Sequence, residues 1–370
     1  MAVYLDHNAT APLTPAARAA MVAWLTGPGG NPSSVHRLGR GARAAVEQAR
    51  RQVAGALGVV PGELTFTSGA TEALHLAVVG VVPPGGHVVA SAVEHPALFG
   101  ACAVAGARVT TVPVNGQGQL DPEAVARAVT PDTALVAVMA AQNEIGTLLP
   151  VAEVAVRVRV PVLCDAAQAF GRIPLQFHAL GCHLGVVSAH KLGGPQGAGA
   201  LWVAPGFALR PWIAGGPQER GRRAGTEHVA ALVGFGAAAA AVPERLAQMA
   251  RVAALRDRFE AGLVRLPGVC LHGDPQARLP NTSAWRFEGV PGDVLLEALD
   301  LEGFFLSGGS ACSSGAVEPS PVLRALGLSA EEARGGLRAS FGPENTEADV
   351  DGVLAVLPGL VARIRGRGPC

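Results

Sequence analysis

The chain alternates between two kinds of segment. Short apolar, β-branched runs, which are typical of buried strands, alternate with longer Ala-rich stretches of helical character. The short runs predict strands over Glu63–Phe66, His87–Ser91, Arg108–Val114, Ala134–Met139, Pro161–Cys164, His183–Ser188 and Ala200–Val203. The longer stretches predict helices over Pro15–Leu25, Val35–Leu57, Thr71–Val81, Pro122–Val129 and Thr226–Ala241.

The uniformity of the apolar runs predicts the kind of sheet. Strands this uniformly apolar are buried on both faces, which favours a mainly parallel sheet covered by helices. Sheets of this kind bind their ligands at the carboxyl ends of the strands. We therefore expect an α/β fold whose functional residues directly follow the strands.

A second, smaller domain is predicted after Pro243. The chain has 370 residues, which is more than one hydrophobic core usually supports. A long helix with an Arg, Leu and Glu pattern, Glu244–Leu266, leads into a second set of short elements. This change of pattern indicates the start of the smaller domain.

Composition and charge narrow the class of protein. The chain is 49% hydrophobic and 16% charged, with 48 Gly and 28 Pro, which suits a compact, loop-rich α/β enzyme. Its formal net charge is +0, so we expect no nucleic-acid partner. We also expect no membrane partner, because the apolar segment Ala237–Val242 is small-residue helix core and not a membrane span. We expect no signal peptide, because Val3–Asp6 leaves no room for one.

The cysteines indicate a reducing compartment. They are scattered without CxxC spacing, which argues against a zinc ribbon or a disulfide scaffold and for a cytoplasmic protein without a metal site. The six are Cys102, Cys164, Cys182, Cys270, Cys312 and Cys370. No role is assigned to Cys370.

Lys191 is the only lysine among 29 Lys and Arg residues. Arginine stays protonated under ordinary conditions, whereas a buried lysine can lose its proton and become a nucleophilic amine. The chemistry that needs such an amine most directly is a Schiff base with a substrate carbonyl or with pyridoxal phosphate (PLP). Composition alone equally allows a lysine left by chance in an Arg-rich chain.

Two strand ends suggest the ligand. The segment Thr67–Glu72 follows a strand and opens a helix, where free N–H groups attract an anion such as phosphate, although Ser68 could simply cap the helix. Asp165 follows another apolar strand, and an acid there needs a cation such as a pyridinium nitrogen, unless it caps the next turn.

A third strand end carries the lysine itself. Lys191 lies in a tight glycine turn, beside Ser188 and His190, which can bind a phosphate. Three strand-end groups that converge on one ligand are more specific than any one of them. Together they predict a PLP site.

The chain resembles the cysteine desulfurase family, a part of the class V group of PLP-dependent, aminotransferase-like enzymes. The resemblance covers nearly the whole chain. Its motifs are Tyr4–Thr10, Asn31–Ser34, Phe66–Glu72, Glu94–Pro96, Gln142–Gly146, Asp165–Gln168, Ser188–Pro195, Arg223–Thr226, Ser307–Ser314 and Gly336–Arg338.

The resemblance implies an architecture. It is the PLP-dependent transferase fold of type I, with a large PLP-binding domain over residues 14–245 and a small domain formed by residues 1–13 and 246–370. The small domain would carry a mobile cysteine loop at about 307–318.

The resemblance also implies roles for residues around the cofactor. Lys191 would form the Schiff base and move a proton, Asp165 would keep the pyridine nitrogen protonated, and Gln168 would hydrogen-bond the phenolic oxygen. His95 would stack on the ring and move protons, unless it is only a structural hydrogen bonder. The phosphate would be held by Ala70, Thr71, Ser188, His190 and, from the second subunit, Thr226. The cross-subunit contact implies a homodimer.

Asn143 and Arg338 would bind the substrate carboxylate, with Asn143 also near the cofactor.

Cys312 supplies the chemistry that distinguishes the family. It lies in Ser307–Gly315, a run of small residues that cannot pack a core and is expected to form a mobile surface loop. Its thiolate would attack the sulfur of the substrate L-cysteine, leaving a persulfide on Cys312 and releasing alanine.

Some questions stay open at this point. Gln142 stands where the family usually has a second Asn, a change that removes no required group. Only 32 residues follow Arg338, so the sulfur acceptor could be an iron–sulfur scaffold or a thiolation enzyme. A selenocysteine lyase and a class V aminotransferase are alternatives, and the aminotransferase would not need Cys312. A non-enzymatic sulfur carrier is disfavoured, because it would not need Lys191, Asp165 or His95.

Overall fold

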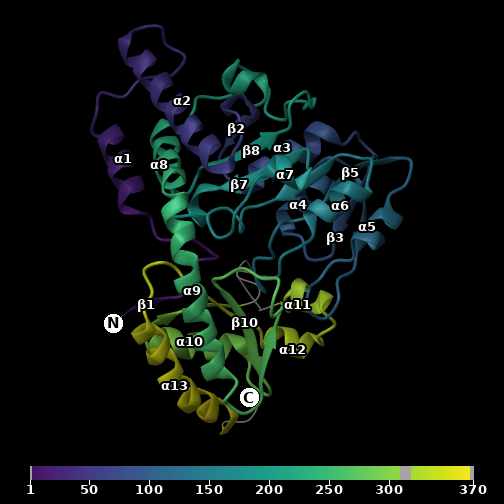
Figure 1. Ribbon diagram of the computed structural model, residues 1–370, viewed down its shortest axis with the longest axis vertical. Coiled ribbons are helices and arrows are strands. Elements are labelled where there is room, and N and C mark those ends of the chain that lie inside the picture. Colours follow the sequence, from purple (N-terminus) through teal and green to yellow (C-terminus); the bar gives the residue numbers. More distant parts are fainter. Residues whose placement is uncertain (1, 309–317, 367–370) are drawn as a thin grey trace.

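The computed structural model describes residues 2–308 and 318–366 (Figure 1). Cys312, Cys370 and most of the predicted cysteine loop lie outside the described residues. Figure 1 shows the elements of the first two thirds of the chain above, apart from β1, which lies below with those of the last third. The long helix α9 (Val242–Leu263) runs from one group to the other.

The large sheet confirms the predicted fold class. Its order is β2-β8-β7-β6-β5-β3-β4, and every strand runs in the same direction except β8, which is antiparallel to both of its neighbours. The strands are β2 (Leu64–Thr67), β3 (His87–Ser91), β4 (Arg108–Val112), β5 (Thr133–Ala137), β6 (Val162–Asp165), β7 (Leu184–Ser188) and β8 (Gly199–Val203).

Helices cover both faces of this sheet. Val187 of β7 packs into a hydrophobic cluster with α1, α2 and α8, whereas its neighbour Val186 packs into another cluster with α3 and α4. This alternation explains why the strands read as continuous apolar runs. The helices are α1 (Pro15–Leu25), α2 (Arg37–Leu57), α3 (Ala70–Val81), α4 (Pro96–Val104), α5 (Pro122–Ala128), α6 (Val151–Arg157), α7 (Phe177–Leu180) and α8 (Val229–Ala240).

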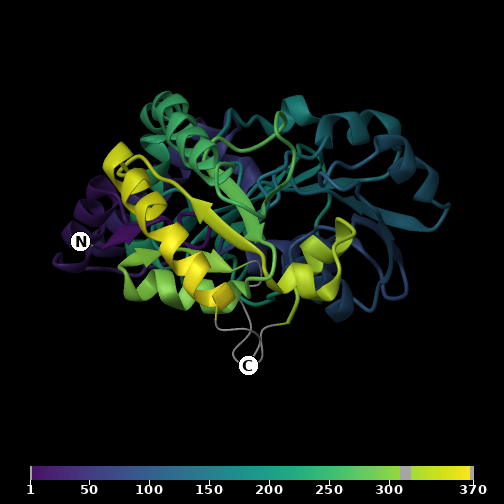
Figure 2. The same ribbon diagram turned by 90° about the horizontal axis from the view of Figure 1, so that it is seen from below.

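The rest of the chain forms a second structural unit around its own hydrophobic cluster (Figure 2). Its antiparallel sheet has the order β12-β13-β10-β9, and the N-terminal β1 (Val3–Tyr4) pairs with β11 in parallel. Leu5 packs into this cluster, which brings the two ends of the chain together. The elements are β9 (Val269–His272), β10 (Thr282–Phe287), α10 (Gly292–Leu301), β11 (Phe304–Phe305), β12 (Ser307–Gly308), α11 (Pro321–Ala325), α12 (Ala330–Arg334), β13 (Leu337–Ser340) and α13 (Glu347–Gly366).

Differences from the sequence-based elements are local. The predicted helix Thr226–Ala241 begins only at Val229, because the His228 side chain accepts the N–H of Ala231 and caps it there. The predicted helix Val35–Leu57 begins at Arg37 for the same reason, with His36 as its cap. The short helices α4, α6 and α7 were not predicted.

The described residues show neither a single membrane-spanning helix nor a cluster of metal-binding side chains. No single helix within 2–308 and 318–366 is long and apolar enough to cross a membrane. The helices α8 and α9 reach that length and apolar composition only together, as a pair bent by 59°. Among the same residues, no group of three or more His, Cys, Asp or Glu side chains could hold a metal ion.

Candidate active site

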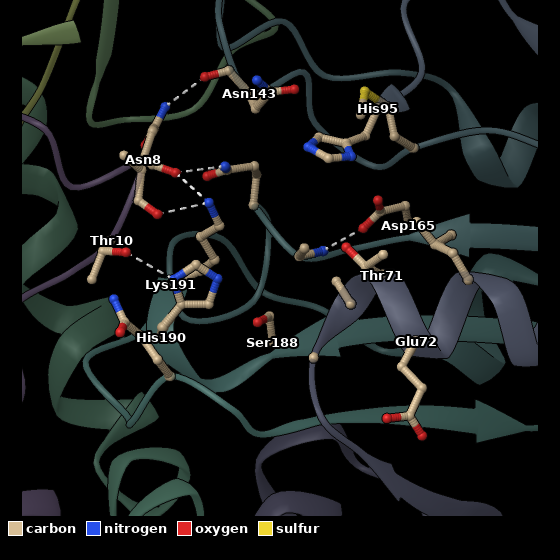
Figure 3. Close-up of a pocket in the computed structure, with 18 of the residues that line it drawn as sticks. Asn8, Thr10, Thr71, Glu72, His95, Asn143, Asp165, Ser188, His190 and Lys191 are labelled. Atoms are coloured by element: carbon tan, nitrogen blue, oxygen red, sulfur yellow. Dashed lines mark hydrogen bonds between the residues drawn. The ribbon is translucent and has the colours of Figure 1, made fainter. Parts of the chain in front are cut away.

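A cavity of about 510 Å³ lies where β2, β6 and β7 end (Figure 3). Ten residues predicted from the sequence line it: Ala70, Thr71, His95, Asn143, Asp165, Gln168, Ser188, His190, Lys191 and Arg338. Sequence reasoning assigned no role to the other lining residues, which include Asn8, Thr10, Glu72, Gln196 and Gly197. For Asn8 and Thr10 the available signal was their place in the Tyr4–Thr10 motif.

The N-terminus of α3 forms one wall of the cavity. Gly69 is its N-cap, with φ 155°, and no side chain accepts the N–H groups of its first turn. A Cβ at Gly199 would lie 2.7 Å from the backbone of Gly69, so a glycine is needed where β8 lies against this turn. Free N–H groups at the start of a twelve-residue helix favour an anion.

Glu72 lies in the same turn, and its charge is compensated. Its carboxylate pairs with Arg223, with Nε 2.7 Å from Oε1, and also accepts the N–H of Ser68 at 2.9 Å. Burial opposes ionisation, but these hydrogen bonds lower the pKa of Glu72 overall. Arg223 therefore reduces the repulsion that Glu72 would exert on an anion bound at the helix start.

Ser188 and His190 form the opposite side of the predicted phosphate site. Ser188 Oγ is buried without a hydrogen-bond partner among the described residues, so it is available to a ligand. His190 Nδ1 lies 3.0 Å from Thr10 Oγ1. Burial, followed by the charges of Lys191 and Arg172, lowers the pKa of His190 to about 4, so this ring is neutral near pH 7.

Asp165 ends β6 and is almost completely buried (6% exposed). Its Oδ1 accepts the N–H of Ala167 at 2.9 Å, and no ion pair forms with it in the described part of the chain. Burial raises the pKa of Asp165, while Ala167, His95 and Lys191 oppose the rise. A cation beside this carboxylate would restore its charge, which is what a protonated pyridine nitrogen provides.

Lys191 follows β7 in a short 3-10 turn, Ala189–Lys191. Its Nζ donates to Asn8 O at 2.7 Å and to Ala9 O at 2.9 Å, as Figure 3 shows. Burial, followed by the charges of Arg172 and Arg338, lowers the pKa of Lys191 to about 8, against the opposing effect of Asp165 and Asp6. The amine is therefore partly neutral near pH 7, as a nucleophile requires.

His95 caps a helix and also lines the cavity. It is the N-cap of α4, and its Nδ1 accepts the N–H of Ala97 at 3.1 Å. Its pKa is lowered by burial and by Lys191, against the effect of Asp165. In the neutral ring, an accepting Nδ1 leaves the proton on Nε2. The structural role of His95 thus leaves its ring face and Nε2 available to the cavity.

Arg338 lies in β13 and reaches the cavity from the second structural unit. Its Nη2 donates to Asp6 Oδ1 at 2.5 Å and its Nη1 donates to Asn143 O at 3.0 Å. Its Nε has no partner among the described residues. Arg338 therefore retains a donor for a ligand, and Asp6, which sequence reasoning did not single out, holds it in place.

Two of the predicted residues are not among the described residues that line the cavity. Thr226 is exposed in the loop before α8 and does not line it, so its predicted contact with a second subunit stays a prediction. Cys312 lies outside the described residues. The carboxylate-binding and phosphate-binding roles of the residues that do line the cavity also stay predictions.

The sequence comparisons agree on one family. The family model "Aminotransferase class-V" matches residues 3–353. The chain is 43% identical to a cysteine desulfurase of Gluconacetobacter diazotrophicus, with 100% of this chain and 95% of that protein covered. It is 44% identical to an IscS-like cysteine desulfurase of Mycobacterium tuberculosis, with 98% and 97% covered.

Solved structures have the same fold. The chain matches a NifS-like protein from Rickettsia africae with a TM-score of 0.90 and 31% identity, over 98% of this chain and 100% of that one. It also matches "SspA in complex with cysteine" with a TM-score of 0.81 and 29% identity, over 93% and 100%.

The chain therefore belongs to the aminotransferase class-V family of PLP-dependent enzymes with the type I fold. Within that family, it is a member of the cysteine desulfurase group.

The residues of the cavity fit pyridoxal 5′-phosphate. Ser188 Oγ and the N–H groups of the α3 first turn have no side-chain partners and suit a phosphate. Asp165 has no ion-pair partner among the described residues, and a pyridinium cation would favour its ionised form despite its burial. Lys191 supplies the amine. These sites lie on three strand ends around one cavity, as a ring with a phosphate at one side and a nitrogen at the other requires.

Proposed function

We propose that this protein removes sulfur from L-cysteine, giving L-alanine and a persulfide on Cys312. The observation that carries the proposal is the convergence of Lys191, Asp165 and Arg338 on one cavity in a chain of the cysteine desulfurase group. Bound PLP supplies an electron sink for the bonding electrons of the substrate Cα–H and Cβ–S bonds. The residues around it hold the substrate and move its protons.

Each residue has a task that its surroundings support. Arg338 binds the substrate carboxylate through N–H groups that it does not use on Asp6 or Asn143. Lys191 takes the Cα proton on its amine, which the lowered pKa makes available near neutral pH. His95 Nε2 donates a proton at the cavity, since its Nδ1 is held by Ala97.

Cys312 completes the reaction in this proposal. Its thiolate attacks the substrate sulfur, a new S–S bond forms, and the Cβ–S bonding pair stays with the carbon skeleton that becomes alanine. The described chain approaches the cavity on both sides of the Cys312 segment: β12 pairs with β13, the strand of Arg338, and Ser320 donates to Glu144 beside Asn143.

The wider setting is also proposed. The persulfide passes to an acceptor protein for iron–sulfur cluster assembly or for thio-cofactor or thionucleoside synthesis. The enzyme acts in the cytoplasm as a homodimer in which Thr226 of each subunit contacts the phosphate in the other. Support for the dimer is that Thr226 is exposed and does not line the cavity of its own chain.

The direct test is a mass measurement. The PLP-loaded enzyme is incubated with L-cysteine and without reductant, and the Cys312 peptide is isolated. We expect it to gain the mass of one sulfur atom, and we expect no such gain in a Lys191→Ala enzyme. Alanine formation without any sulfur on the Cys312 peptide would refute the proposed nucleophile and favour a lyase reaction.

A further inference from the structure

Arg172 is a fully buried cation behind the wall of the cavity. It is 1% exposed, and within the described residues no carboxylate pairs with its guanidinium. Burial and the charges of Arg245 and Arg338 lower its pKa, but a guanidinium stays protonated in the ordinary pH range. A buried charge without an ion pair is costly, so its contacts indicate what it does.

Its contacts are three carbonyl oxygens on two segments. Arg172 Nη1 donates to the main-chain oxygen of Gln168 at 2.7 Å and to its side-chain Oε1 at 2.8 Å. Arg172 Nη2 donates to the main-chain oxygen of His7 at 2.9 Å. Arg172 thus joins the turn after β6 to the N-terminal segment whose carbonyls at Asn8 and Ala9 receive Lys191.

These contacts fix the side-chain amide of Gln168. A guanidinium can only donate, so the amide atom that faces Arg172 must be the oxygen, and Nε2 must lie on the other side. Nε2 donates one of its two hydrogens to Asn8 O at 3.0 Å. The second hydrogen has no partner in the part of the chain that the structure describes, and Gln168 lines the cavity.

We propose that Arg172 is a positioning residue: it holds the Gln168 amide with an N–H toward the cavity, to donate to the phenolic oxygen of the bound cofactor. The proposal rests on the PLP site of the proposed function. The charge of Arg172 on Oε1 also polarises the amide, which strengthens the N–H as a donor. Gln168 then stabilises the deprotonated phenolic oxygen.

The test follows the absorption band of the bound cofactor as a function of pH, with no cysteine present. Losing the donor destabilises the deprotonated oxygen, so Arg172→Met should move the pH midpoint of the spectral change up by about one unit. Arg172→Lys keeps the charge but has one nitrogen for two segments, and it should shift the midpoint less. Arg256→Met, which removes another buried guanidinium (8% exposed), should leave the midpoint unchanged.

A double-mutant cycle with Gln168→Met separates the positioning from a purely electrostatic effect. The charged groups nearest Lys191 are Arg172, Arg338, Asp165 and Asp6, so Arg172 also acts on the lysine directly. If Arg172 works through Gln168, Arg172→Met should shift the midpoint much less in the Gln168→Met background. The same shift in both backgrounds, or an unchanged midpoint in Arg172→Met, would overturn the proposal.

The outcomes remain decisive when a variant or the enzyme fails. Should Arg172→Met not fold, Arg172→Lys decides, because a wild-type midpoint in that variant contradicts the need for two separate donor nitrogens. A wild-type protein that binds no PLP overturns both this inference and the proposed function. A protein with the expected midpoints that releases no sulfur from cysteine overturns the proposed function alone.

Discussion

The lowered pKa of Lys191 leads to a quantitative prediction about the cofactor-free protein. A pKa of about 8 instead of 10.5 makes the amine neutral in about one molecule in ten at pH 7, rather than in about one in three thousand. The gain in reactive amine at neutral pH is therefore about 300-fold, since each unit of pKa is a factor of ten.

Trace labelling with acetic anhydride measures this, because the reagent acylates only neutral amines and Lys191 is the only lysine. We expect the labelling rate of the Lys191 peptide to rise with pH up to about 8 and then level off. The N-terminal amine of the same molecules is an internal control. Arg338→Met should raise the midpoint and Asp165→Asn should lower it, because Arg338 lowers and Asp165 raises the pKa of Lys191.

The same shift predicts a pH dependence of stability. Between pH 8 and 10.5 the unfolded chain holds a proton on Lys191 that the folded chain lacks, so this group makes the free energy of unfolding rise with pH in that window. A labelling rate that keeps rising nearly tenfold per pH unit above pH 8, up to about pH 10, would refute the reasoning. It would mean that water solvates the Lys191 amine and that folding does not lower its pKa.

Three further predictions concern sulfur release, the subunit contact and the loop before α8. Cys312→Ala should keep the cofactor absorbance but release no sulfide from cysteine; unchanged release, measured colorimetrically, would assign the reaction to a lyase. Thr226→Val should speed PLP loss during dialysis, and a monomer with full PLP occupancy would contradict the contact between subunits. Glu219→Gln should cost about 3 kcal/mol of unfolding free energy in urea titrations, because it removes the buried charge partner of the Arg50 guanidinium, 2.6 Å and 2.7 Å away, and leaves Arg50 with the more exposed Glu47, 3.1 Å from its Nε. Asp132→Asn, at an exposed pair with Arg108, is the matched control and should change stability little; equal effects would contradict the role of burial.

The sequence predicted the central sheet because burial on both faces leaves a local trace. Most strands from β2 to β8 are short apolar runs, the exception being the largely exposed edge strand β4 (Arg108–Val112), and the predicted ranges overlap all of them. Helix α1 was predicted to the residue, and the ends of α2, α3, α5 and α8 were predicted to within three residues. The seven-residue helix α5 was predicted, and it begins after the capping residue Asp121. The helices α4 and α6 were missed because α4 is apolar throughout and shows no polar face, and α6 begins after Pro150 without a side-chain cap.

Residues at strand ends were predictable for a related reason. Lys191, Asp165 and Ser188 each follow an apolar run, and parallel strands bring such residues to one edge of a sheet. Asp6, Asn8 and Arg172 carry no such signal. Asp6 meets Arg338 across 332 positions of sequence, and Arg172 reaches His7 across 165. These contacts form only in the folded protein, where the N-terminal segment packs beside the cavity.

By itself, the sequence determined the class of fold, the cofactor and most of the side chains around it, because each depends on residues that are close together along the chain. The tertiary structure decided how those side chains are charged and oriented. Burial lowers the pKa of Lys191, the Ala97 N–H holds the ring of His95, and the Arg172 guanidinium sets the amide of Gln168. These properties depend on desolvation and on contacts between distant segments, which only the folded chain brings about.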